Sequence, residues 1–317
     1  MSHESALEFW RVAEARHSLS GKVSRAKSLP VRPFDLSGVH RENPLGLTLP
    51  FHILVGSGNV RRTSESLRFH VCSREYPGGS FMEYPSGLVV SSPELCFLQI
   101  ASLLSLEELI MLGFELCGSY RIGNRKEPSK GFREDSPLTS VAKLKGYLIR
   151  APRIKGKVLA CQALQFIANH SASPRETVLA MLLTLPYRLG GYGFPMPVLN
   201  LTIDVPISGK KTSPVKERRC DLFWQKEQVA VEYDSNAFHA NEDRIAEDAI
   251  RRNALIAAGI TVIVASNKHI KDARELRVLA GLLEKLLKKR LSIRDKKFIA
   301  RQRTLRASIL LKAPLEE

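Results

Sequence analysis

The sequence predicts an α/β protein of the α+β type, in which an αβββαβ core with a mixed sheet follows an N-terminal mixed α/β domain. Three observations favour this fold class. The chain has 317 residues, 44% of them apolar, and is long enough to bury two cores. Capped helical segments alternate with strand segments between Ser173 and about Ile270. The sequence has no internal repeat and no low-complexity tract, so a repeat architecture is not expected.

The expected domains are residues 1–155, residues 156–290 and a basic C-terminal tail, 291–317. In the first domain, "FHILV" (51–55) and "LRFHV" (67–71) are strand-like. A helix is expected to begin at Ser92-Pro93, and a second at Ser105, where Glu108 stands in capping-box spacing. The domain therefore mixes short strands with a helix pair.

The second domain is expected to begin its core with a helix whose N-cap is Ser173 and whose N3 residue is Glu176. Strands at about 197–206, 218–224 and 229–234 follow, then a helix at 242–258 and a strand at 260–265. The last strand, "ITVIVA", is apolar throughout, which predicts that both of its faces are covered.

The formal net charge of +16 indicates an anionic partner, most often nucleic acid. Residues 271–317 hold 14 Lys/Arg and 6 Asp/Glu, so they supply +8 of it. This segment is either a solvated helical face or a phosphate-contacting surface. In the second case Lys288, Lys289 and Arg290 are candidate nucleic-acid contacts.

Several classes of protein are disfavoured. The five cysteines are an odd number without C-x-x-C spacing, which argues against disulfides and zinc and for buried thiols. The N-terminus lacks a signal-peptide pattern, and no run approaches ~20 apolar residues, so a cytoplasmic protein without a membrane partner is expected. P-loop, H-E-x-x-H and G-x-S-x-G motifs are absent, and "VGSGNVR" (55–61) lacks the third glycine of a dinucleotide site.

The stretch "CDLFWQKEQVAVEYDS" (220–235) predicts a β-hairpin that carries three acids. With a turn at Gln225–Gln228, Asp221 lies opposite Glu232, and Asp234 shares their face. Opposed residues have Cβ atoms about 4.5–5.5 Å apart, where like charges repel. Such carboxylates must share a proton, shift their pKa values or hold a cation, and Mg²⁺ or Mn²⁺ would suit them. The alternatives are a shifted register, or a structural acid cluster that Arg219 and nearby lysines neutralise.

Four pieces in this order carry a resemblance: "SPRE", "CDLFW", "VAVEYDS" and "RIAEDAIRRNALIAAGITVIVAS". The region from Ser173 to about Ile270 resembles the restriction-endonuclease-like fold of the PD-(D/E)xK nucleases, in the branch related to very-short-patch-repair endonucleases. The segment "GLVVSSPELCFLQIASLLSLEELIMLGFELCG" is similar to one that precedes such domains in proteins related to abortive-infection antitoxins. DNA reading by this half is not supported, because residues 1–50 show no helix-turn-helix.

The resemblance implies that Asp221 and Glu232 bind Mg²⁺ or Mn²⁺, with Glu176 as the helix glutamate directed at the metal. Asp234 stands where most of the family has a lysine, which leaves the general base unassigned. His239 is the candidate for that role or for the leaving group, and Lys226 in the turn is a possible source of positive charge.

Each of these residues also has a simpler interpretation. Glu176 is explained by a capping box, and His239 by an ordinary surface loop. Arg251 and Arg252 follow Glu247 and Asp248 by four residues, so they form helix ion pairs or, as the alternative, contact DNA phosphates.

The resemblance implies a metal-dependent DNA endonuclease that hydrolyses phosphodiester bonds in phage or mobile-DNA defence or in repair. The alternative is a catalytically inactive DNA-binding regulator or antitoxin on a nuclease fold, favoured by the missing lysine and the basic tail. A protein-interaction module with an incidental acidic cluster is the third hypothesis. The sequence predicts neither the oligomeric state nor the preferred nucleic acid.

Overall fold

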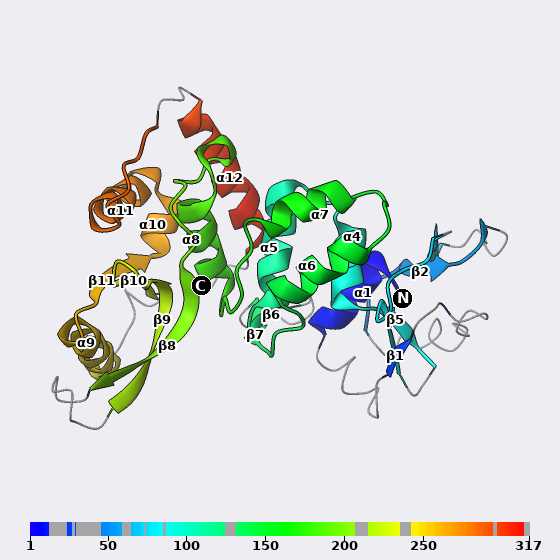
Figure 1. Ribbon diagram of the computed structural model, residues 1–317, viewed down its shortest axis with the longest axis horizontal. Helices are drawn as coiled ribbons and strands as arrows, with labels where there is room; N and C mark the ends of the chain where they lie inside the picture. The colour runs from blue at the N-terminus through cyan, green and yellow to red at the C-terminus, as the bar shows by residue number, and fades with distance from the viewer. Residues whose placement is uncertain are drawn as a thin grey trace. The chain divides into compact units, whose positions relative to one another are not determined.

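The computed structural model describes residues 1–12, 24–26, 29, 46–58, 65–72, 74–84, 87–123, 131–206, 215–234, 242–293 and 297–313 (Figure 1). The chain divides into two compact units. Unit 1 comprises Met1–Leu116, Arg121–Arg133 and Pro137–Ile167, and unit 2 comprises Cys117–Tyr120, Glu134–Ser136 and Ala168–Glu317. In the part of the chain that is described, no helix has the length and apolar character needed to cross a membrane.

Unit 1 combines short strands with helices, as the sequence predicted for the N-terminal half. Strands β2 and β3 pair in parallel, β4 lies between β1 and β5, and β6 pairs with β7. Its elements are α1 (His3–Arg11), β1 (Ser24–Ala26), β2 (Phe51–Val55), β3 (Leu67–Val71), β4 (Phe81–Glu83), β5 (Val89–Ser91), α4 (Pro93–Ile100), α5 (Leu106–Cys117), β6 (Tyr120–Ile122), β7 (Phe132–Glu134), α6 (Val141–Arg150) and α7 (Lys157–Leu164).

The predicted helix starts in unit 1 are confirmed by their caps. The Ser92 Oγ accepts a hydrogen bond from the backbone N–H of Leu95 at the start of α4. Before α5, the Glu108 N–H donates to Ser105 Oγ (3.3 Å) and the Ser105 N–H donates to Glu108 Oε2 (3.0 Å). This reciprocal pair is a capping box, which satisfies backbone donors that the helix itself cannot bond.

Unit 2 contains the predicted element order αβββαβ, followed by further helices. The four-stranded sheet has the order β11-β10-β9-β8; β10 and β11 are parallel and the other pairs antiparallel, so the sheet is mixed. The elements are α8 (Pro174–Thr184), the 3₁₀ turn η2 (Tyr187–Leu189), β8 (Val198–Pro206), β9 (Val215–Trp224), β10 (Val229–Asp234), α9 (Glu242–Ala257), β11 (Thr261–Ser266), α10 (Asn267–Lys271), α11 (Ala273–Leu286) and α12 (Phe298–Lys312).

The register of the β9–β10 hairpin is the predicted one. Val229 pairs with Trp224 and Val231 with Leu222, so the next position brings Glu232 level with Asp221. The turn requires Gln228 in the left-handed region, at φ 55°. A one-residue shift, the alternative considered for this hairpin, is therefore excluded.

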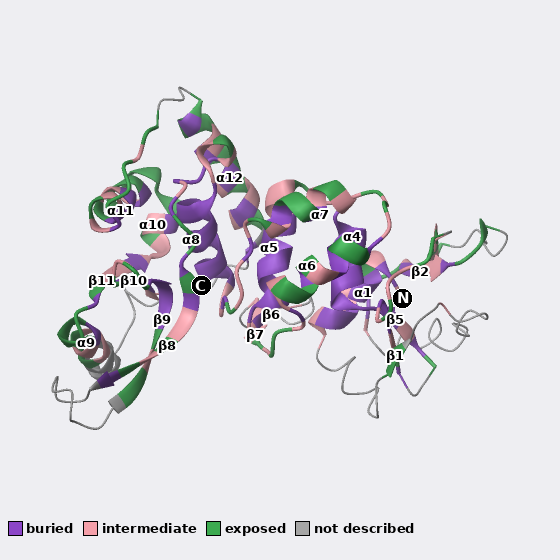
Figure 2. Cartoon of the chain, viewed as in Figure 1, coloured by how far each residue is buried: buried purple, intermediate pink, exposed green. Residues whose placement is uncertain are grey.

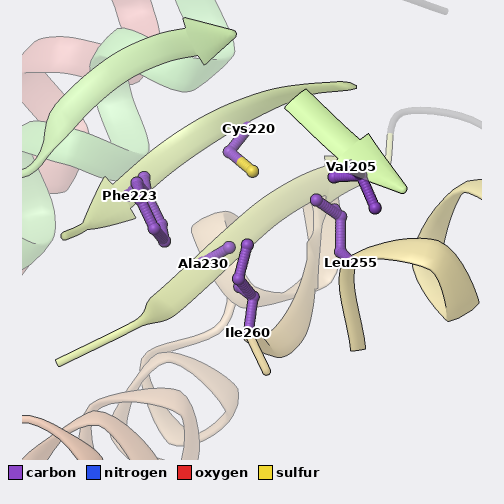
Figure 3. Close-up of a cluster of buried hydrophobic side chains, with 6 residues drawn as sticks. All are labelled: Val205, Cys220, Phe223, Ala230, Leu255 and Ile260. Atoms are coloured by element: carbon purple, nitrogen blue, oxygen red, sulfur yellow. The ribbon is translucent and has the colours of Figure 1, made fainter. Parts of the chain in front are cut away.

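Helices cover the sheet of unit 2. Helix α8 contacts β9 and is buried along its length, as Figure 2 shows. Helix α9 packs against the strands through one apolar cluster (Figure 3), formed by Val205, Cys220, Phe223, Ala230, Leu255 and Ile260. The first four residues of β10 are all buried, because this strand is central in the sheet.

The prediction that β11 is covered on both faces was wrong. Val262, Ile263 and Val264 are only half-buried, and Thr261 is exposed. Among the described strands, β11 is at the edge of the sheet and pairs with β10 alone, so an apolar run did not distinguish an edge strand from a central one.

Helix α9 is expected to depend on Leu255, which is 0% exposed within the cluster. Leu255→Ala should lower the free energy of unfolding by about 2–5 kcal/mol, because it removes apolar contacts and leaves a cavity. The neighbouring Ile256 is 52% exposed, and Ile256→Ala should have less than about 1 kcal/mol of effect. Urea denaturation followed by circular dichroism checks both values, and equal losses would contradict the packing described for α9.

Candidate active site

The start of α8 holds the first of three buried carboxyl groups. The Glu176 N–H donates to Ser173 Oγ (3.1 Å), which confirms the predicted cap. The Glu176 carboxyl group reaches further back than a capping box requires, since its Oε2 accepts the N–H of Ala172 (2.9 Å). Capping therefore fixes Glu176, but does not account for its second partner.

That second partner is Asn200 of β8, which the sequence analysis did not identify. Its Nδ2 donates to Glu176 Oε2 (2.6 Å) and to the backbone carbonyl of His170 (2.8 Å). Asn200 has φ 50°, and its Oδ1 is buried with no hydrogen-bond partner. Asparagine tolerates the left-handed region better than most residues, so an Asn between Leu199 and Leu201 was the available signal.

Asp221 and Glu232 lie on neighbouring strands and are 8% and 6% exposed. The Tyr233 N–H donates to Asp221 Oδ2 (2.7 Å), and the Asp221 backbone N–H donates to the Glu232 carboxyl group. Each strand thus donates a backbone hydrogen bond to the acidic side chain of the other strand. The predicted proximity of these two carboxyl groups is confirmed by these exchanged bonds.

Strand β9 is irregular where it carries Asp221. Leu199 of β8 pairs with Leu222 of β9, and Leu201 pairs with Cys220. The residues between these two pairs are Asn200 and Asp221. Cys220 and Phe223 belong to one apolar cluster, although strict alternation would put them on opposite faces (Figure 3). The register is the same on both sides, so the irregularity is a local change of backbone direction, with Asn200 at φ 50°, and not a bulge with an extra residue.

The three carboxyl groups act on one another electrostatically. Burial, and then the charge of Asp221, raise the pKa of Glu232 to about 7, although Arg251 opposes the shift. Burial and then Asp221 raise the pKa of Glu176 to about 7 as well. The pKa of Asp221 is also raised by burial, although the Tyr233 N–H opposes the shift. The group defined by Glu176, Asp221 and Glu232 is called the acidic cluster below.

A cation from α9 partly neutralises the acidic cluster. The Arg251 guanidinium forms an ion pair with Glu232 Oε2, whereas Glu232 Oε1 is buried without a hydrogen-bond partner. The sequence analysis had paired Arg251 with Glu247 or with DNA. The side chain of Glu247 is outside the described residues, so its helix pair with Arg251 stays a prediction.

The remaining predicted site residues lie elsewhere or are not described. Asp234 ends β10 and is half-buried, and His239 lies outside the described residues. Arg252 is half-buried on α9, and Lys226 is exposed in the hairpin turn. Lys288, Lys289 and Arg290 follow α11 and are exposed, with Lys289 Nζ donating to the Gly193 carbonyl (2.5 Å).

The donor set of the acidic cluster is chemically suited to a hard divalent cation. Carboxylate oxygens are the ligands that Mg²⁺ and Mn²⁺ prefer, and Glu232 Oε1 is buried without a hydrogen-bond partner. Among the described residues, however, no three His, Cys, Asp or Glu side chains are arranged to hold a metal ion. A cation would therefore have two carboxylates, Asp221 and Glu232, as its protein ligands in this arrangement, and it would compete with Arg251.

Comparison of the chain with models of protein families, with curated proteins and with solved structures gives no match.

The raised pKa of Glu176 predicts how stability depends on pH. Its ordinary value is 4.5 and its value in the folded protein is about 7, so the folded state binds more protons than the unfolded state between these pH values. Stability should therefore fall, by about 1–3 kcal/mol for this group, as the pH rises from about 4.5 to about 7. Urea denaturation across this range in EDTA should show the decline.

Glu176→Gln should reduce the decline, because glutamine does not titrate. Glu217→Gln, which removes an exposed carboxyl group of β9, is the matched control. A wild-type decline that Glu176→Gln leaves unchanged would show that the Glu176 carboxyl group is not the titrating group.

Proposed function

We propose that unit 2 is a nuclease domain of the PD-(D/E)xK type that hydrolyses phosphodiester bonds in DNA with Mg²⁺ or Mn²⁺. One observation carries the proposal: Asp221 and Glu232 are buried on adjacent strands, and Asp221 raises the pKa of Glu232. Two buried like charges without a cation are unfavourable, and strongly perturbed carboxyl groups concentrate at functional sites.

The surrounding elements support this interpretation. The order α8-β8-β9-β10-α9-β11 and the mixed sheet agree with the fold that the sequence resemblance implies. The irregular part of β9 falls at Asp221 and at its neighbour on β8, Asn200. Glu176 comes from α8, as the resemblance expects, and its charge adds to that of the pair.

Asp221 and Glu232 are the residues proposed to hold the cation, which would activate a water and neutralise charge on the scissile phosphate. Asn200 holds the Glu176 carboxyl group through its Nδ2. Glu176, with a pKa of about 7, is placed to keep or release a proton near neutral pH. His239 remains the proposed general base, because Asp234 occupies the position of the usual lysine.

The proposed DNA partner rests on charge. Lys288 and Arg290 are exposed after α11, and Arg252 lies one residue beyond the arginine that contacts the acidic cluster. Exposed lysine and arginine side chains contact phosphates with little sequence preference and with strong dependence on salt. The net charge of +16 agrees with such a partner.

The proposal predicts that the wild-type protein nicks or linearises supercoiled plasmid in Mg²⁺ or Mn²⁺ and that Asp221→Asn lowers the rate on the order of a hundredfold or more. Asp204→Asn removes an exposed carboxyl group from the same sheet and should cleave normally. Retention of DNA by all three proteins in a filter-binding assay separates chemistry from binding. Cleavage by Asp221→Asn at the wild-type rate would contradict the proposal.

A catalytically inactive DNA-binding regulator is the second candidate, and Arg251 favours it. An arginine that neutralises Glu232 can replace a cation permanently. Asp234 in place of the lysine is consistent with lost catalysis.

Arg251→Ala distinguishes the two candidates by a measurement that does not depend on activity. Without Arg251, Glu232 is a buried carboxylate with less compensation, and stability in EDTA at pH 8 should fall by about 2–4 kcal/mol. In the nuclease account, millimolar Mn²⁺ restores most of this loss, because the cation takes the place of the guanidinium. Thermal denaturation measures both quantities, with Arg252→Ala as control. A loss that Mn²⁺ does not restore would favour the regulator.

A further inference from the structure

Unit 1 contains a cavity of about 510 Å³ that the proposed function does not use. It lies where the start of α1, the end of β3 and the segment after it, the end of α4 and the loop before α7 meet. Its volume is within the roughly 300–1,000 Å³ of small-molecule sites. The lining residues are His3, Leu54, His70, Val71, Cys72, Arg74, Tyr76, Gln99, Ser102, Arg153, Ile154 and Lys155.

The permanently charged residues that line the cavity are all positive. Arg74, Arg153 and Lys155 are exposed at the cavity, and none of its described lining residues is Asp or Glu. Glu75, next to Arg74 in the sequence, is exposed and does not line the cavity. Three cations on a concave surface attract a ligand with more than one negative charge.

The inner wall of the cavity carries a buried amide. Gln99 is 3% exposed and accepts the N–H of His3 through Oε1 (3.1 Å). Burial raises the pKa of Tyr76, whereas a hydrogen bond with the Gln99 side chain lowers it. Gln99 therefore contacts both His3 and Tyr76, two of the rings that line the cavity.

Flat and apolar groups complete the wall. The rings of His3 and His70 stack with centroids 3.7 Å apart. Burial, and then the neighbouring His70 and His52, lower the pKa of His3 to about 3, so its ring is neutral at physiological pH. Tyr76 and Ile154 add an aromatic and an apolar surface. The positive charge therefore comes from the three basic side chains, and the wall suits an uncharged ring.

We propose that this cavity binds a phosphorylated small molecule of the nucleotide class. Its phosphates would contact Arg74, Arg153 and Lys155, and its base or other ring would lie on the wall formed by His3, His70 and Tyr76. A concave site of about 510 Å³ with a ring-binding wall favours a small ligand over a DNA backbone, which needs an extended basic groove. The proposal is independent of nuclease activity in unit 2.

The test is isothermal titration calorimetry of the full chain with ATP, adenosine and inorganic phosphate as probes. ATP should bind at one site, and adenosine should bind at least about tenfold more weakly because it lacks the phosphates. Arg153→Gln/Lys155→Gln should weaken ATP binding at least about tenfold. Lys143→Gln/Lys145→Gln removes two exposed charges from α6, outside the cavity, and should leave the affinity within about twofold.

Three results would overturn the proposal. They are no detectable ATP binding, equal binding of ATP and adenosine, and equal weakening by the two double variants. A single-stranded oligonucleotide that binds more tightly than ATP and abolishes the ATP binding signal would instead indicate that the cavity contacts DNA. Because the variants lie in unit 1, plasmid cleavage by the Arg153→Gln/Lys155→Gln protein reports on unit 2 separately.

Discussion

The repulsion between the buried carboxyl groups of Asp221 and Glu232 is the interaction on which the site in unit 2 depends. The hairpin register brings the two acids level on adjacent strands, and burial prevents water from screening them. Apolar residues, which β10 has at Val229, Ala230 and Val231, would not cause this repulsion. In the proposed nuclease, a divalent cation bound between the two acids would offset it.

The neighbouring elements each reduce the repulsion without removing it. Backbone donors are exchanged across the hairpin, α9 contributes Arg251, and β8 contributes Asn200 to hold Glu176. The pKa values of Glu176 and Glu232 nevertheless remain raised to about 7. Arg251 supplies only part of the positive charge that would neutralise the cluster. The nuclease proposal assigns the rest to a divalent cation, whereas the regulator proposal leaves Arg251 in that role.

Local patterns predicted much of this arrangement. The caps at Ser92, Ser105 and Ser173 and the register from Trp224 and Val229 follow from short-range rules, and the structure has them. The break at Asp221 and the Arg251–Glu232 pair could not be predicted, because they depend on elements distant in sequence. The left-handed Asn200 was not predicted, although its residue type tolerates that conformation. The cavity of unit 1 was missed for the same reason: His3, Tyr76, Gln99 and Arg153 come from separate segments.

Anomalous diffraction from crystals grown in Mn²⁺ at pH 8 tests the central claim most directly. The account predicts a peak within about 2.0–2.2 Å of carboxylate oxygens of both Asp221 and Glu232, with the Arg251 guanidinium displaced from Glu232. A fully occupied Arg251–Glu232 ion pair with no peak between the two acids would contradict it. The acidic cluster would then be a structural one, neutralised by the protein itself.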